Sequence, residues 1–194
     1  MTTLNPSIAP RVLADTIAGT RVRDALLVVG GAILVGLSAQ VSVLLPFTPV
    51  PFTMQTFAVL LVGAGLRWQR ALPSMLLYLA AGSVGVPWFA GGSSGFGGAS
   101  FGYIVGFILA AAVVGRLAEA RADRKPLSTF ATMVLGSGII YAVGVPWLAV
   151  SYEVGLGRAI SLGLVPFLVS DLLKAAAAGL LLPGTWWLVG RRQA

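Results

Sequence analysis

The chain has 194 residues, of which 57% are hydrophobic and 10% are charged, and its mean hydropathy is +0.92. Soluble domains carry roughly 25% charged residues, and a soluble globule of this length could not bury so much apolar surface. The composition therefore excludes an ordinary soluble domain and predicts an integral membrane protein. The absence of cysteine and histidine excludes disulfides and the commonest zinc ligands.

The first 24 residues are predicted to form a cytoplasmic tail, and residues 25–190 are predicted to form one transmembrane domain. The tail carries Arg11, Arg21 and Arg23 beside Asp15 and Asp24. No small-residue cleavage site follows the first apolar run, so we expect a retained tail and not a signal peptide.

Apolar runs along the chain predict an all-α bundle of six transmembrane helices. A bilayer core of about 30 Å needs about 20 helical residues. Runs of that order lie at about 25–45, 52–66, 71–86, 101–117, 127–150 and 159–189. Three prolines between residues 46 and 51 end the first run, because proline cannot continue a helix.

The basic residues predict the orientation of this bundle. If the N-terminus is cytoplasmic, eleven of the thirteen Lys and Arg residues lie on the cytoplasmic side: Arg11, Arg21, Arg23, Arg67, Arg70, Arg116, Arg121, Arg124, Lys125, Arg191 and Arg192. This asymmetry follows the positive-inside rule and places both termini in the cytoplasm. The net charge of +7 could also indicate a nucleic-acid-binding protein. Such a protein would carry these basic residues together on one face of the fold, so their placement in this chain favours a membrane protein.

Two outer connections differ from the plain basic inner ones. Residues 45–53 are rich in proline, and residues 88–101 are rich in glycine and aromatic side chains. Loops this long without secondary structure are usually functional. The glycine stretch at 91–98 lacks the lysine of a phosphate-binding loop, so we expect no ATP hydrolysis by this chain and interpret it as backbone that folds over a ligand.

Asp171 and Lys174 are the charged residues that lie inside a predicted span, about 15 Å from its outer end. Charges at that depth are costly and usually mark functional sites. Three residues apart, they share one helix face and offer both acceptors and donors to a neutral polar group such as a ureido or amide ring. An ion pair that only pins helix packing is the alternative.

An amide and several aromatic residues are predicted to surround the same site. Gln55 follows the proline-rich connection, and Tyr78, Phe89 and Tyr103 lie in or near the second outer connection. Such side chains suit a small ligand with an apolar body and few polar atoms. The alternative for the aromatic residues is the interfacial belt of membrane proteins, which we favour for Trp88.

Small residues recur at four-residue spacing, including Ala32 and Gly36 in the first predicted helix. Such spacing lets helices approach closely. It predicts helix contacts within the chain or with a partner.

Four segments together resemble one family. They are TPVPFTMQ at residues 48–55, LYLAAG at 77–82, VPWFAGG at 86–92 and DLLK at 171–174. In combination and in this order they resemble the BioY family, the biotin-specific substrate-binding S components of energy-coupling-factor (ECF) transporters. The resemblance covers most of the chain, from the first predicted helix to the sixth.

The resemblance implies a six-helix subunit of the plasma membrane that captures biotin from outside, without a cofactor and without enzymatic activity. The first loop (residues 45–53, with Phe52) and the third loop (residues 88–101, with Gly91 and Gly92) would cap the pocket. Asp171 and Lys174 match the family's binding pair, and Gln55 matches its amide. Import would need a coupling membrane protein and two ATPase subunits.

Two departures from the family pattern affect these expectations. Residues 98–102 read GASFG, where relatives carry a Gly-Pro-Thr-Gly-like turn. The helix-one motif that meets the coupling protein is typically Ala-x-x-x-Ala, and its nearest match here is Ala32 with Gly36. The predicted cap and the predicted partner interface therefore rest on weaker matches than the ligand pair.

Two other functions are alternatives to this interpretation. An ion-coupled carrier could use Asp171 as its coupling carboxylate, but such carriers usually show two related halves, and no internal repeat is evident. An intramembrane enzyme would have to build a nucleophile and base without histidine or cysteine.

Overall fold

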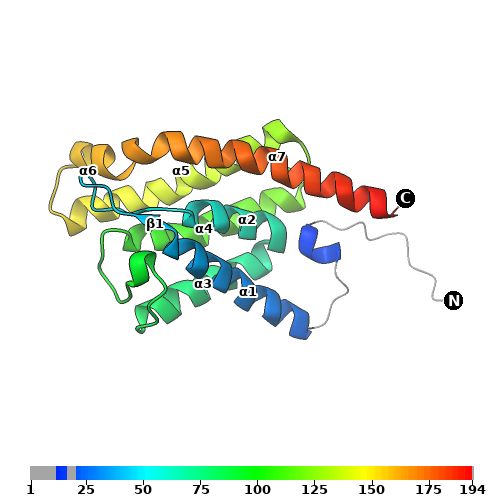
Figure 1. The fold of residues 1–194 in the computed structure, drawn as a ribbon, viewed down its shortest axis with the longest axis horizontal. Helices are drawn as coiled ribbons and strands as arrows, with labels where there is room; N and C mark the ends of the chain where they lie inside the picture. Colours follow the sequence, from blue (N-terminus) through cyan, green and yellow to red (C-terminus); the bar gives the residue numbers. More distant parts are fainter. Residues whose placement is uncertain (1–11, 17–20, 194) are drawn as a thin grey trace.

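The computed structural model describes residues 12–16 and 21–193, and their fold is the all-α bundle that the sequence predicts. The helices in these ranges are α1 (Arg21–Gln40), α2 (Gln55–Leu66), α3 (Trp68–Ser83), α4 (Phe101–Glu119), α5 (Pro126–Ser151), α6 (Leu156–Gly163) and α7 (Leu168–Gln193) (Figure 1). Short 3-10 turns cover Leu13–Thr16, Ala90–Gly92 and Val165–Phe167. Strands β1 (Ser42–Val43) and β2 (Phe52–Thr53) pair antiparallel and close the base of the proline-rich loop.

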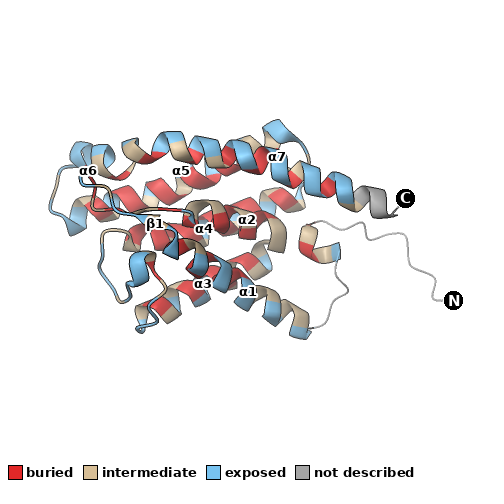
Figure 2. Cartoon of the chain, viewed as in Figure 1, coloured by how far each residue is buried: buried red, intermediate tan, exposed pale blue. Residues whose placement is uncertain are grey.

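Helix α4 lies in the middle of the bundle. It packs against α2, α3 and α5, while α1 packs on α3 and α7 packs on α5. Glycines make this packing close, since a Cβ on Gly63 would lie 2.9 Å from the Ala111 carbonyl oxygen and one on Gly106 would lie 3.0 Å from the Ile140 Cα. Buried residues face inward on each helix, and exposed ones form the outer faces (Figure 2).

The outer faces are apolar, as a lipid environment requires. Leu180 on α7 is 74% exposed and Leu37 on α1 is 63% exposed. Within the described residues, four helical stretches are long and apolar enough to span a membrane: Arg21–Gln40, Phe101–Glu119, Pro126–Ser151 and Leu156–Val189. Helices α2 and α3, with 12 and 16 residues, are shorter than the roughly 20 that a full crossing needs.

The boundaries around the first inner turn differ from those predicted. The second run begins as a helix only at Gln55, because Phe52 and Thr53 pair with Val43 and Ser42 in the small hairpin. Residues 67–70 do not form a loop. Arg67 alone, with a φ of +70°, joins α2 to α3, which starts at Trp68.

The sixth predicted helix, 159–189, is not continuous. Helix α6 ends at Gly163 and α7 begins at Leu168, with a 3-10 turn at Val165–Phe167 between them. Pro166 in this turn has no N–H to donate to the preceding turn and breaks the helix. The break places Asp171 in the first turn of α7, so this residue lies at a helix start and not deep within a long helix.

The predicted cytoplasmic tail lies partly outside the described residues, which exclude 1–11 with Arg11 and 17–20. In the described part, Val12 is fully buried and the Asp15 Oδ1 lies 3.2 Å from the Arg70 Nη1. Residues 21–24 belong to α1. The segment at 12–16 therefore packs on the bundle through an ion pair.

Candidate ligand-binding site

The predicted charge pair forms at the start of α7. The Lys174 Nζ lies 2.9 Å from the Asp171 Oδ1, and both side chains are largely buried. The pair shares one face because three residues separate its members. The carboxylate also lies in the first helical turn, where the unpaired N–H groups of the helix favour negative charge.

The ammonium of Lys174 connects α7 to β2, at the base of the proline-rich loop, and to α2. It donates to the Thr53 carbonyl oxygen at 2.8 Å and to the Thr56 Oγ1 at 3.0 Å, besides its bond to Asp171. Three donors thus meet three acceptors. The Phe52 ring centroid lies 5.1 Å from the Nζ, within cation–π range.

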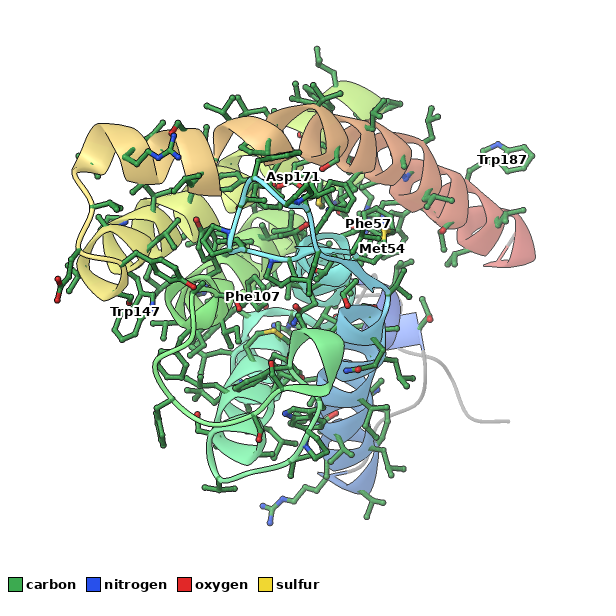
Figure 3. All side chains as sticks on the ribbon, turned by 60° about the vertical axis from the view of Figure 1, so that its left-hand side comes forward. Met54, Phe57, Phe107, Trp147, Asp171 and Trp187 are labelled. Carbon is green, nitrogen blue, oxygen red and sulfur yellow. The ribbon has the colours of Figure 1, made fainter. Side chains whose placement is uncertain are left out.

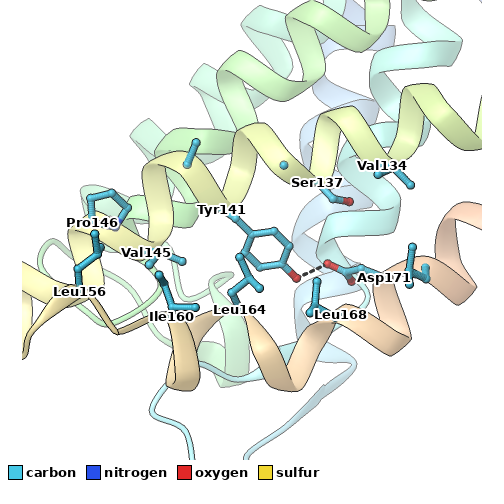
Figure 4. A pocket seen from close by; sticks show the side chains of 13 residues that line it. Val134, Ser137, Tyr141, Val145, Pro146, Leu156, Ile160, Leu164, Leu168 and Asp171 are labelled. Carbon is cyan, nitrogen blue, oxygen red and sulfur yellow. Dashed lines mark hydrogen bonds between the residues drawn. The ribbon is translucent and has the colours of Figure 1, made fainter. Parts of the chain in front are cut away.

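Both oxygens of the Asp171 carboxylate are hydrogen-bonded. Its Oδ1 also accepts from the Thr56 Oγ1 at 3.2 Å, and its Oδ2 accepts from the Tyr141 hydroxyl of α5 at 2.5 Å. Figure 4 shows the Tyr141 ring reaching from α5 to this carboxylate. Complete pairing of this kind is what makes a charge tolerable in a low-dielectric interior.

A small cavity of about 40 Å³ adjoins this network. Its lining combines hydrogen-bonding side chains with aromatic rings of α4 and of the α6–α7 turn. Figure 3 shows Phe107 and Asp171 inside the bundle, with Trp187 pointing away from it. The lining residues are Val50, Pro51, Thr53, Gln55, Thr56, Ser100, Tyr103, Ile104, Phe107, Tyr141, Phe167, Asp171 and Lys174.

Gln55 and Tyr103, both predicted from the sequence, line the cavity. Gln55 is the first residue of α2 and donates from its Nε2 to the Tyr78 hydroxyl at 2.7 Å. Tyr103 donates to the Gly163 carbonyl oxygen at 2.9 Å and so connects α4 to the end of α6.

Tyr78 lies behind the cavity and links Gln55 to the glycine-rich loop. Its hydroxyl donates to the Trp88 carbonyl oxygen at 3.1 Å, and the Trp88 Nε1 donates to the Tyr78 carbonyl oxygen at 3.0 Å. Tyr78 is fully buried. Tyr78 therefore holds the Gln55 side chain in place. It does not itself line the cavity.

Three other predicted residues lie away from the cavity. Phe89 is buried, its ring centroid 5.3 Å from that of Tyr78, and a Cβ on Gly82 would overlap its ring. Gly91 and Gly92 are exposed at the surface with φ values of +67° and +73°, a conformation that favours glycine. These residues shape and anchor the third loop.

The predicted partner-interface residues of α1 are enclosed by the chain itself. Ala32 is fully buried, and a Cβ on Gly36 would lie 3.1 Å from the Trp88 ring. Gln40, one turn further, donates to the carbonyl oxygens of Trp88 and Phe89 at 3.1 and 3.3 Å. Gly36 therefore makes room for the Trp88 ring within the chain, and the partner interface at Ala32 and Gly36 stays a prediction.

Two residues that were not predicted from the sequence, Thr56 and Tyr141, complete the polar network. A hydroxyl in the middle of the apolar run 127–150 was the available signal for Tyr141, because a buried tyrosine hydroxyl usually has a partner. Thr56 follows Gln55 directly, but its partners lie on α7, 115 and 118 positions away in the sequence. No local pattern indicates such a contact.

Comparison with known proteins decides the family. The sequence profile of the BioY family matches residues 10–191. The chain belongs to the BioY family. Its relatives include the protein named "Biotin transporter BioY" from Thermotoga maritima, 38% identical over 152 residues that cover 76% of this chain and 86% of the relative. Another is the "Probable biotin transporter BioY" from Pyrococcus horikoshii, 37% identical over 75% of this chain and 85% of the relative.

A solved structure shares the BioY fold seen here. It is the crystal structure of the S-component for biotin from an ECF-type ABC transporter, which aligns with a TM-score of 0.77 at 21% sequence identity. The alignment covers 87% of this chain and 94% of that one. The family resemblance found in the sequence motifs is therefore confirmed, together with the fold.

Proposed function

We propose that this BioY protein binds biotin from outside the cell and serves as the S component of an ECF-type vitamin importer. The observation that carries the proposal is the network of Asp171, Lys174 and Gln55 beside an aromatic wall, in a chain whose relatives are named biotin transporters. It is a transporter subunit and not an enzyme.

The chemistry of the network suits the ureido ring of biotin. That ring has one carbonyl oxygen and two N–H groups, so it needs donors and acceptors close together. Lys174 and Gln55 would donate to the ring, while Asp171 and the Thr56 hydroxyl would accept from it, in exchange for part of the pairing that they make without a ligand. Phe107 and Phe167 provide the apolar surface that the sulfur-containing ring and the aliphatic chain require.

Binding requires the proline-rich loop, residues 44–51, to move. The cavity of about 40 Å³ is far below the roughly 300 Å³ or more of typical ligand pockets. Val50 and Pro51 form part of its wall, and the Thr48 Oγ1 holds the loop by donating to the Leu162 carbonyl oxygen at 2.7 Å. We expect this loop to open for entry and to close over the ligand.

The proposed topology has six crossings of the plasma membrane with both termini in the cytoplasm, and residues 25–190 as the membrane domain. One end of the bundle carries the start of α1, the α2–α3 link and the α4–α5 loop, and the opposite end carries the proline-rich and glycine-rich loops (Figure 1). Arg23, Arg67, Arg70 and Arg124 belong to the first end. Their position supports a cytoplasmic assignment for that end.

Energy for import would come from partner subunits, a coupling membrane protein and two ATPases. A shallow groove of about 240 Å³ between α1 and α2 offers an apolar helix a close approach, with Leu26, Gly30, Leu34 and Gly65 in its lining. A Cβ on Gly30 or Gly65 would meet nothing within 4 Å. We propose this groove, and not the enclosed Ala32 and Gly36, as the coupling surface.

Ligand analogues test the proposed recognition directly. The purified protein should bind labelled biotin, and unlabelled biotin should compete far better than 2-iminobiotin, which lacks the ureido oxygen. Loss of a hydrogen bond to a charged group should weaken competition roughly 10-fold to 100-fold. Equal competition by the two compounds would contradict recognition through the ureido group, and no binding of biotin at all would contradict the function.

A further inference from the structure

A second, larger hollow lies on the outside of the bundle between α5 and the α6–α7 segment. It has a volume of about 470 Å³. Val134, Gly138, Ala142 and Pro146 form its α5 wall, and residues at every fourth position from Leu156 to Leu172 form the facing wall. The four-residue spacing on α5 keeps its lining side chains on one helix face. The facing residues come from α6, the turn after it and the start of α7, and the two walls run alongside each other as a groove (Figure 4).

Small side chains on α5 create this groove. A Cβ on Gly138 would meet nothing within 4 Å, and Ala142 adds only a methyl group one turn later. Branched side chains face them across the gap, including Ile160 and Leu164. The groove is therefore built into the sequence of both walls and is lined almost entirely by hydrocarbon.

Tyr141 and Asp171 separate the groove from the polar cavity, since both residues line both spaces. The carboxylate receives Lys174 and Thr56 on its Oδ1 and the Tyr141 hydroxyl on its Oδ2. The Tyr141 hydroxyl thus supplies the hydrogen bond to the Oδ2. Both oxygens of this carboxylate therefore keep their hydrogen bonds when the groove holds an apolar occupant.

We propose that the groove binds a hydrocarbon chain of a membrane phospholipid, with the Tyr141 ring as the wall between lipid and ligand pocket. Its rims are on the outer surface, where Leu156 is 58% and Leu172 is 47% exposed, so the bilayer is the medium that meets it. A void lined by hydrocarbon forfeits dispersion contacts that an acyl chain would supply.

The length of the groove fits one leaflet. The α5 wall from Val134 to Pro146 spans about 18 Å at the helical rise, close to half of the roughly 30 Å hydrocarbon core. Val134 lies eight residues after the start of α5 and Pro146 lies five before its end, so in the proposed orientation the wall crosses the middle of the membrane and extends further towards the outer side, from which biotin enters. The lipid would close the side of the bundle, leaving the proline-rich loop as the route of entry.

A photoactivatable phosphatidylcholine, carrying a diazirine in its acyl chain, tests the inference in nanodiscs of the full chain. Crosslinks should concentrate at residues 134–146 and 156–172. They should fall roughly tenfold, equivalent to losing about two buried methylene contacts, when Gly138→Phe fills the groove from one wall. Ile160→Trp, which fills it from the other wall, should act likewise if the first variant folds poorly.

Gly184→Phe is the matched control, because Gly184 is an open, exposed position on α7 outside the groove. It should leave the crosslinks unchanged. Crosslinks that are as frequent around Leu180 as in the groove, and that persist in both filled variants, would overturn the proposal in favour of ordinary lipid contact. Clearance of the crosslinks by excess biotin would also overturn it, by showing that the vitamin occupies the groove.

Discussion

At the scale of single residues, the Tyr141 hydroxyl stabilises the fold because it donates a hydrogen bond to one oxygen of a buried carboxylate. Tyr141→Phe leaves the Asp171 Oδ2 without this donor and should lower the free energy of unfolding by about 1–3 kcal/mol. Tyr103→Phe, the matched control, removes a bond to the neutral carbonyl of Gly163 and should cost about half as much. Thermal unfolding of the two variants without ligand measures this, and equal losses would contradict the assigned pairing.

A second buried carboxylate lies at the opposite end of the bundle. Asp123, in the loop between α4 and α5, is only 1% exposed, and the Trp186 Nε1 of α7 donates to its Oδ2 at 2.5 Å. The Arg124 Nε lies 3.6 Å from its Oδ1. Burial raises the pKa of Asp123 above its usual 3.8, although the Trp186 hydrogen bond and the Arg124 charge oppose this.

The raised pKa of Asp123 predicts a pH dependence with a definite sign. Above the unfolded pKa of 3.8, the folded state holds the proton more tightly than the unfolded state, so this residue's contribution to stability falls as pH rises through the folded pKa. Asp123→Asn still accepts from Trp186 but does not titrate. Its melting temperature should therefore decline less between about pH 4 and pH 7. Glu153→Gln is the exposed control, and parallel curves for Asp123→Asn and the unmodified protein would contradict the assignment.

At the scale of elements, the two faces of α1 have different neighbours. The face with Gly36 packs against Trp88, and the face with Gly30 lines the groove between α1 and α2. Gly36→Leu should displace the Trp88 ring, lower stability by about 1–3 kcal/mol through overpacking, and weaken biotin binding by freeing the third loop. Gly30→Leu meets no neighbour within the chain, so it should leave stability and binding intact while reducing ATP-driven uptake by the assembled transporter. Uptake at the unmodified level in Gly30→Leu would count against the α1–α2 groove as the coupling surface.

Hydropathy predicted most elements because a membrane helix must be apolar along its whole length. The predicted run 127–150 corresponds to α5 at 126–151, and the predicted run 101–117 corresponds to α4 at 101–119. The break at Pro166 could not be predicted in the same way, because a proline within a membrane helix can either kink the helix or interrupt it. Pro146 and Pro183 lie inside continuous helices of the same chain.

The candidate site was predictable where it depends on local spacing. Asp171 and Lys174 meet because three residues separate them, and that follows from helix geometry alone. The roles of Phe89 and Gly36 could not be read in this way, because they depend on how a glycine-rich loop folds back against α1 and α3. Contacts between distant segments leave no periodic signal in a single sequence.

At the scale of the whole molecule, the bundle has a basic end and an opposite end with the proline-rich and glycine-rich loops, and the assignment of the two ends to the two sides of the membrane is testable. The chain contains no cysteine, so a single introduced thiol gives no background. Glu153→Cys should react with a membrane-impermeant maleimide in intact cells, whereas Arg121→Cys should react only after permeabilisation. The reverse pattern would contradict the cytoplasmic location of both termini.

The central claim is that biotin binds at the Asp171–Lys174 pair, and binding of labelled biotin to purified variants tests it most directly. Asp171→Asn and Lys174→Met should each weaken binding roughly 10-fold to 100-fold, since a hydrogen bond to a charged group contributes about 1.5–3 kcal/mol. Glu153→Gln, with its side chain exposed in the α5–α6 loop, should bind like the unmodified protein. Folded Asp171→Asn and Lys174→Met proteins that retain full affinity would contradict the claim.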